Sequence, residues 1–200
     1  LLNRPEAARM GGQKREVAIL MSDIRGFTPL SETLAPEEII RFLNLYFSRL
    51  IQVIQEHQGI IVDFFGDAVL VFFDPFDDPV KPMIKKAVGC AFKMQGSMKE
   101  FNREMLSENL PSLEMGIGIN AGVVVVGNIG SETRAKYGIV GSPVNLTQRI
   151  QSTAEEGEVV ISDSVYKHVP DDVRVKRKFR IKLKGVQEES TLYGVGSRIL

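Results

Sequence analysis

The chain has one cysteine, two histidines and no excess of either charge, and each shortage excludes a kind of site or partner. Cys90 has no second cysteine to pair with, which excludes an internal disulfide and a zinc site built from several cysteines. Lys and Arg total 25 and Asp and Glu total 25. The net charge therefore gives no indication of a nucleic-acid partner or of direct contact with an anionic membrane. His57 and His168 are interpreted as surface residues.

Long hydrophobic runs are also missing. No apolar stretch approaches the roughly 20 residues that span a bilayer, and the first residues lack the regions of a signal peptide. We therefore expect a cytoplasmic domain, which an upstream part of a longer protein could tether to a membrane. Residues 1–13 contain Pro5 and two glycines and are interpreted as a linker to an upstream regulatory domain. Residues 14–200, rich enough in apolar residues for a good core, are predicted to form one domain.

The most informative stretch is IIVDFFGDAVLVFF, at residues 60–73. Two apolar runs flank DFFGD, a pattern that predicts a tight β-hairpin with Asp63 and Asp67 at its turn. A carboxylate between buried strands loses solvation, so it needs a cation or hydrogen bonds to stay ionised. By itself, a Gly-Asp pair is also typical of an ordinary turn.

A second motif, MSDIRGFT at residues 21–28, follows an apolar run and precedes a long helical pattern. A strand that ends in Asp23 and continues through a Gly-containing loop to a helix can hold a metal at the strand end and phosphates on the loop amides. Asp23 and Asp67, on neighbouring strands, would face one divalent ion. Hard oxygen ligands with no Cys or His nearby favour Mg²⁺ or Mn²⁺ over zinc.

Hydrophobic periodicity indicates the element order β-α-β-β-α-β. This order predicts an α+β fold with a ferredoxin-like core, in which helices cover one face of an antiparallel sheet. C-terminal strands and short helices extend this core. The predicted strands are 16–23, 60–62, 68–73, 113–120, 122–128, 158–162, 174–184 and 190–195, and the long helices are 36–58 and 82–106.

A third motif, GSPVNLTQR at residues 141–149, is expected to begin a helix with Ser142 at the N-cap and Pro143 at the first position. Asn145 and Arg149 are four residues apart and therefore share one helical face. By themselves, an Asn and an Arg on a helix surface are unremarkable.

Together, SDIRGFT, FFGDAVL and GSPVNLTQR resemble the catalytic domain of bacterial class III nucleotidyl cyclases, the adenylyl and guanylyl cyclases. The resemblance covers residues 14–196. It implies that two metal ions, held by Asp23, Asp67 and the Ile24 carbonyl, assist attack of the ribose 3′-oxygen on the α-phosphorus, with pyrophosphate as the leaving group. It also implies that Asn145 orients the ribose and that Arg149 stabilises charge on the α-phosphate.

The resemblance further implies a homodimer with two equivalent sites. In this family the metal carboxylates come from one domain, and the Asn/Arg helix and the base-reading residues come from the other. The segment 129–137 is expected to be an arm that reaches across. Phosphate contacts are expected from Gly26, Phe27 and Thr28, and from Lys184, which ends a basic strand otherwise interpreted as a solvated face.

Two positions read the purine in this family. The first is three residues before the Gly of the GD turn, where adenylyl cyclases usually have Lys and guanylyl cyclases Glu; here it is Asp63. A carboxylate can accept from guanine N1–H and its 2-amino group, but it would face the acceptor N1 of adenine. The second position, usually Asp or Thr in adenylyl and Cys in guanylyl enzymes, is Gly138, which discriminates weakly. We therefore expect GTP to be preferred, with ATP as the alternative substrate.

Two rival interpretations predict features that this sequence does not show. A catalytically silent nucleotide-binding or dimerisation module on the same fold would have lost a metal aspartate, the Asn or the Arg, and all four are present. A diguanylate cyclase or polymerase palm would have a GG[DE]EF-type turn, which is absent. The enzyme interpretation is therefore preferred.

Overall fold

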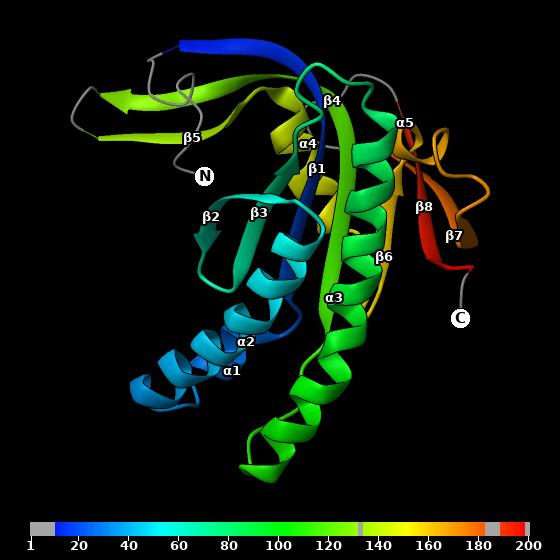
Figure 1. Cartoon of the computed structure of the whole chain (residues 1–200). Helices are drawn as coiled ribbons and strands as arrows, with labels where there is room; N and C mark the ends of the chain where they lie inside the picture. The colour runs from blue at the N-terminus through cyan, green and yellow to red at the C-terminus, as the bar shows by residue number, and fades with distance from the viewer. Residues whose placement is uncertain (1–10, 132–133, 183–188, 199–200) are drawn as a thin grey trace.

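A computed structural model of the chain describes residues 11–131, 134–182 and 189–198 (Figure 1). The first elements are β1 (Gly11–Ile24), α1 (Phe27–Ser31), α2 (Pro36–Glu56), β2 (Ile60–Phe65), β3 (Ala68–Phe73) and α3 (Lys81–Ser107). The later elements are β4 (Met115–Ser131), β5 (Arg134–Val140), α4 (Ser142–Gln151), β6 (Val159–Ser162), α5 (Asp163–Tyr166), β7 (Val173–Ile181) and β8 (Ser190–Ser197).

The central strands lie in the order β2-β3-β1-β4, and each neighbouring pair is antiparallel. This is the strand order of a ferredoxin-like core, so the predicted α+β class is confirmed. The sheet continues through β6, β8 and β7, and β5 pairs with the far end of β4. β6 runs parallel to β4 and is the exception to the expected antiparallel pairing.

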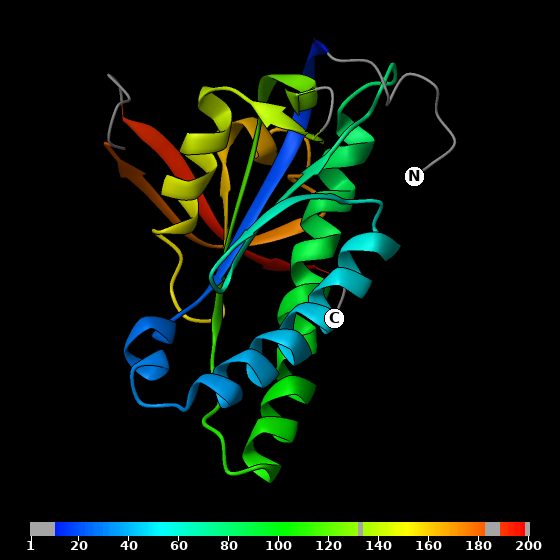
Figure 2. The same cartoon turned by 90° about the vertical axis from the view of Figure 1, so that its left-hand side faces the viewer.

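The two faces of the sheet are covered by different helices. Ala18 and Leu20 of β1 belong to the core beneath α2 and α3, whereas Ile19 and Met21 belong to a second core on the opposite face. Figure 2 shows α2 and α3 on one side of the sheet and α4 on the other. Because side chains alternate along a strand, Asp23 lies on the α4 face.

Helix α2 buries a wider stripe than the sequence predicted. The expected apolar face included Ile39, Leu43 and Phe47, which are only half-buried at the edge of the core. Phe42 and Tyr46, which the prediction omitted, are 1% exposed and lie at its centre. The buried face of such a helix is more than 100° wide, so residues spaced at i and i+4 mark only part of it.

Helix α3 fills the same core with flexible side chains. Met94, Met98 and Met105 are buried, as predicted for core filling, and so is Cys90. Among the described residues, no helix combines the length and apolarity needed to cross a membrane.

Strand β4 is the main correction to the predicted fold. We expected two strands, 113–120 and 122–128, joined by a hairpin, but β4 is unbroken because β1 pairs with it from Gly11 opposite Asn128 to Ile24 opposite Met115. The same register moves the start of β1 to Gly11, so residues 11–13, expected in the linker, belong to the strand.

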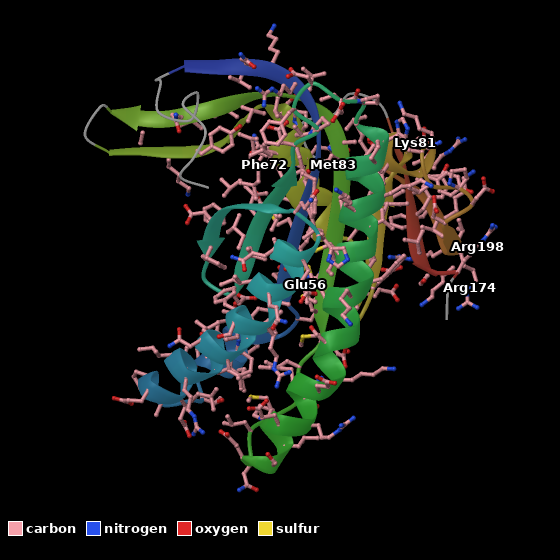
Figure 3. The ribbon with its side chains drawn as sticks, in the orientation of Figure 1. Glu56, Phe72, Lys81, Met83, Arg174 and Arg198 are labelled. Atoms are coloured by element: carbon pink, nitrogen blue, oxygen red, sulfur yellow. The ribbon has the colours of Figure 1, made fainter. Side chains whose placement is uncertain are left out.

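The actual hairpin joins β4 to β5. We call the paired segments 125–131 and 134–140 the arm; it projects beyond the rest of the sheet (Figure 1). Phe72 of β3, labelled in Figure 3, packs against Tyr137 of the arm with ring centroids 6.0 Å apart. Arg15 of β1 donates to Asp74 at 2.7 Å, and the Tyr137 hydroxyl donates to the same carboxylate at 3.3 Å. Asp74 therefore links the base of the arm to β1.

Replacing Asp74 with alanine should lower the free energy of unfolding by about 3 kcal/mol. The Asp74 side chain is fully buried and that of Arg15 is 17% exposed, so the substitution leaves a largely buried guanidinium without this partner. Urea denaturation at fixed protein concentration measures the change. Asp78→Ala, in the exposed part of the same loop, is the control and should change stability by less than about 0.5 kcal/mol. Equal effects of the two substitutions would contradict the role of Asp74.

Candidate active site

Asp23 and Asp67 meet where the end of β1 lies beside the β2–β3 turn. Asp67 shares this turn with Gly66, whose φ of 62° favours glycine. The Asp67 carboxylate accepts the backbone N–H of Ile24 at 2.7 Å, so the turn is bound to the residue that follows Asp23. Burial raises the pKa of Asp23, the Arg25 guanidinium opposes this rise, and the charge of Asp67 adds to it.

This pair fits a hard divalent cation. A bound cation would relieve both the repulsion between the carboxylates and the cost of burying Asp23. No group of three or more His, Cys, Asp or Glu side chains suited to a metal occurs in the described part of the chain. The remaining ligands would be the Ile24 carbonyl, water and substrate phosphates, which is the pattern typical of Mg²⁺.

The predicted phosphate loop is the start of a short helix. Gly26, with φ of 72°, precedes α1, and Phe27 and Thr28 are its first residues. The first N–H groups of a helix have no intrahelical acceptor and can bind an anion. The Phe27 ring is buried and stacks on Phe42 with centroids 5.9 Å apart, so only its backbone can serve a ligand. Lys184 lies outside the described residues.

Helix α4 packs closely on a stripe of small residues in β4. A Cβ on Gly118 would overlap the backbone of Gln151, and one on Gly122 would come within 2.8 Å of Pro143. Asn120, between the two glycines and 3% exposed, donates to the Pro143 carbonyl at 3.3 Å. The alternation G-x-N-x-G was visible in the sequence, but the sequence analysis assigned it no role.

Asn145 and Arg149 line a cavity of about 870 Å³ bounded by α4, β6, α5 and β8. Its polar lining includes Asp163 and Ser164, which the sequence analysis did not identify. The described residues that line it include neither Asp23 nor Asp67. The metal carboxylates and the Asn/Arg pair therefore form two separate half-sites on the same face of the sheet.

The start of α4 differs slightly from the prediction. Ser142 is the first helical residue rather than the N-cap, Gly141 precedes it, and no side chain caps the helix. Pro143 still lies within the first turn, where its missing N–H costs no hydrogen bond.

The two predicted base-reading positions, Asp63 and Gly138, lie close to each other. Asp63 is opposite Leu70, a residue of the second core, which puts it on the α4 face. A Cβ on Gly138 would meet the side chain of Val62, the neighbour of Asp63, at 3.4 Å. Lys136, two residues before Gly138, forms an ion pair with Asp63. The hydrogen bond from Lys136 is the main cause of the lowered pKa of Asp63.

Sequence reasoning missed Lys136. Lys136 lies two positions before Gly138, and this spacing could have indicated it, because residues two apart in a strand share a face.

Comparisons with known proteins show which family the chain resembles. The family model described as the adenylate and guanylate cyclase catalytic domain matches residues 11–196. The structure of the guanylyl cyclase Cya2 is 44% identical with a TM-score of 0.90, over 94% of this chain and 95% of that chain. The structure of the adenylyl cyclase CyaB from P. aeruginosa is 34% identical with a TM-score of 0.89, over 96% and 100% of the respective chains.

Curated relatives are longer. An adenylate cyclase of Anabaena cylindrica is 33% identical over 190 residues, which cover 90% of this chain and 37% of that protein. Adenylate cyclase 1 of Rhizobium meliloti is 29% identical over 95% of this chain and 29% of that protein. The chain thus spans about a third of the length of the curated relatives it matches.

Proposed function

Because this chain belongs to the family of adenylate and guanylate cyclase catalytic domains, we propose that it converts GTP into 3′,5′-cyclic GMP and pyrophosphate at sites shared by two copies. The observation that carries the proposal is the pair of half-sites on one face of the sheet. Asp23 and Asp67 form one, and the cavity with Asn145 and Arg149 forms the other.

The reaction needs prearranged positive charge more than a protein nucleophile. Negative charge grows on the α-phosphate and on the departing pyrophosphate, and a fixed guanidinium such as Arg149 stabilises it. Asn145, one turn earlier on the same face of α4, is placed to hydrogen-bond the ribose. Two Mg²⁺ or Mn²⁺ ions at Asp23, Asp67 and the Ile24 carbonyl would supply Lewis-acid activation of the 3′-oxygen and neutralise the triphosphate. The amides of Gly26 to Thr28 lie beside this metal half-site.

The arm supports the homodimer. Val123, Val125, Ile129 and Val140, on or next to the arm, are 41–58% exposed. A group of exposed apolar side chains marks an interaction surface. A second copy related by a two-fold axis would cover this surface and bring the half-sites of opposite chains together.

GTP is the proposed substrate because Asp63 offers a carboxylate beside the open position at Gly138. Its oxygens can accept from guanine N1–H and the 2-amino group, and the Lys136 ammonium can donate to O6. ATP is the second candidate, favoured by the same ion pair, because Lys136 can donate to adenine N1 while Asp63 accepts from the 6-amino group. Relatives of both kinds resemble the chain.

The proposal is tested by incubating purified protein with Mn²⁺ and labelled GTP or ATP. Release of pyrophosphate together with a cyclic product is expected. A folded protein that forms no cyclic product from either nucleotide would contradict the proposal.

The ratio of kcat/KM for GTP to that for ATP should exceed one. Asp63→Lys should lower this ratio several-fold, because an ammonium cannot accept from guanine N1–H and the 2-amino group. Asp77→Lys, at an exposed loop position, is the charge-matched control and should leave the ratio unchanged. A ratio below one would favour ATP, and a ratio insensitive to Asp63→Lys would remove Asp63 from base recognition.

A further inference from the structure

One guanidinium connects the two half-sites of a single chain. Arg25 donates from Nη1 to Asp23 at 2.7 Å, from Nη2 to the Gln151 carbonyl at 2.6 Å and from Nε to the Ala154 carbonyl at 3.0 Å. Gln151 is the last residue of α4, so Arg25 bonds the C-terminal end of the helix that carries Arg149. A cation is favourable at that end of a helix.

The space for this guanidinium is built into the sheet. Gly116 of β4 is directly opposite Asp23 of β1, and a Cβ on Gly116 would overlap the guanidinium of Arg25. The Arg25 side chain is 20% exposed, and each of its three guanidinium nitrogens donates to a different acceptor. A lysine has a single ammonium and cannot reproduce this planar fork.

We propose that Arg25 is a positioning residue that serves both active sites of the dimer. The proposal rests on the shared site proposed above, in which Asp23 of a chain serves one site while α4 of the same chain serves the other. Arg25 fixes the metal carboxylate and the Asn/Arg helix relative to each other. One guanidinium thereby holds Asp23 for one site and the helix of Arg149 for the other.

Mixed dimers separate the two roles of Arg25. When an Asp23→Ala chain pairs with an Arg149→Ala chain, the one intact site takes its metal carboxylates from the second chain and its α4 from the first. Adding Arg25→Ala to the Asp23→Ala chain tests only the anchoring of α4. We expect kcat to fall about tenfold, the loss typical of a charge-assisted hydrogen bond, with an unchanged Mn²⁺ midpoint. Adding it to the Arg149→Ala chain instead tests only the carboxylate and should raise the Mn²⁺ midpoint about threefold or more.

Two further measurements keep the proposal testable if Arg25→Ala is poorly stable. Gly116→Ala keeps every charge and the Arg25 side chain itself but displaces the guanidinium, a flexible side-chain end, so it should reproduce both effects. In homodimers of either variant, without nucleotide, Mn²⁺ should raise the melting temperature less than in the parent protein. Arg41→Ala, which breaks an exposed ion pair between α2 and Glu108, is the matched control and should behave like the parent.

The outcomes distinguish this inference from the proposed function. Absence of activity in the parent mixed dimer would overturn the shared site and with it the role of Arg25 in both sites. Activity in the mixed dimer that Arg25→Ala and Gly116→Ala do not alter would overturn only the role of Arg25. An equal loss of kcat whichever chain carries the substitution, with no change in the Mn²⁺ midpoint, would overturn it too, because that is the signature of general destabilisation.

Discussion

Replacing Asp67 with alanine is expected to reduce turnover at least about 10³-fold while leaving the fold largely intact. Loss of a single preorganised electrostatic group typically costs 10²- to 10³-fold, and Asp67 is one of only two carboxylates proposed to hold the metal ions. The structural cost is smaller. The substitution removes one hydrogen bond, from the Ile24 N–H at 2.7 Å, worth about 1 kcal/mol.

Turnover with saturating Mn²⁺ and the melting temperature should be measured on the same preparation. Asp77→Ala, at an exposed aspartate close in the chain, should retain parent activity. Substantial metal-dependent turnover in folded Asp67→Ala protein would remove Asp67 from the metal site and with it the two-carboxylate arrangement.

The parts of the site that sequence predicted are local in the chain. Asp67 lies with Gly66 in the two-residue turn between β2 and the buried strand β3, and Asn145 and Arg149 are one helical turn apart. Both relations depend only on strand and helix periodicity. The order of the first strands and helices was predicted for the same reason.

Features that depend on distant parts of the chain were missed. The bonds of Arg25 to Gln151, at the end of α4, and to Ala154 beyond it span 126 and 129 residues. The ion pair of Lys136 with Asp63 spans 73. No local pattern specifies such contacts. The predicted break in β4 at residue 121 failed similarly, because pairing with β1 along the full length of residues 115–128 overrides a local turn signal.

Mixing inactive Asp23→Ala protein with inactive Arg149→Ala protein is expected to restore activity. In a homodimer with shared sites, each variant damages both sites, whereas a heterodimer keeps one site in which both half-sites are intact. Random exchange makes half of the dimers heterodimers, each with one of its two sites intact, so about a quarter of the parent activity should return. The measurement is cyclic product formed after the two proteins have exchanged subunits.

Mixing Asp23→Ala with Asp67→Ala protein is the matched control. Both substitutions lie in the metal half-site. Every dimer in that mixture therefore has two active sites that each lack one metal carboxylate, and no activity should return. Exchange itself can be followed with differently labelled chains. If the first mixture exchanges subunits and stays inactive, the metal carboxylates and Arg149 of one chain act in the same site. The separate cavity around Arg149, whose described lining contains neither Asp23 nor Asp67, argues for the opposite result, in which those aspartates come from a second copy.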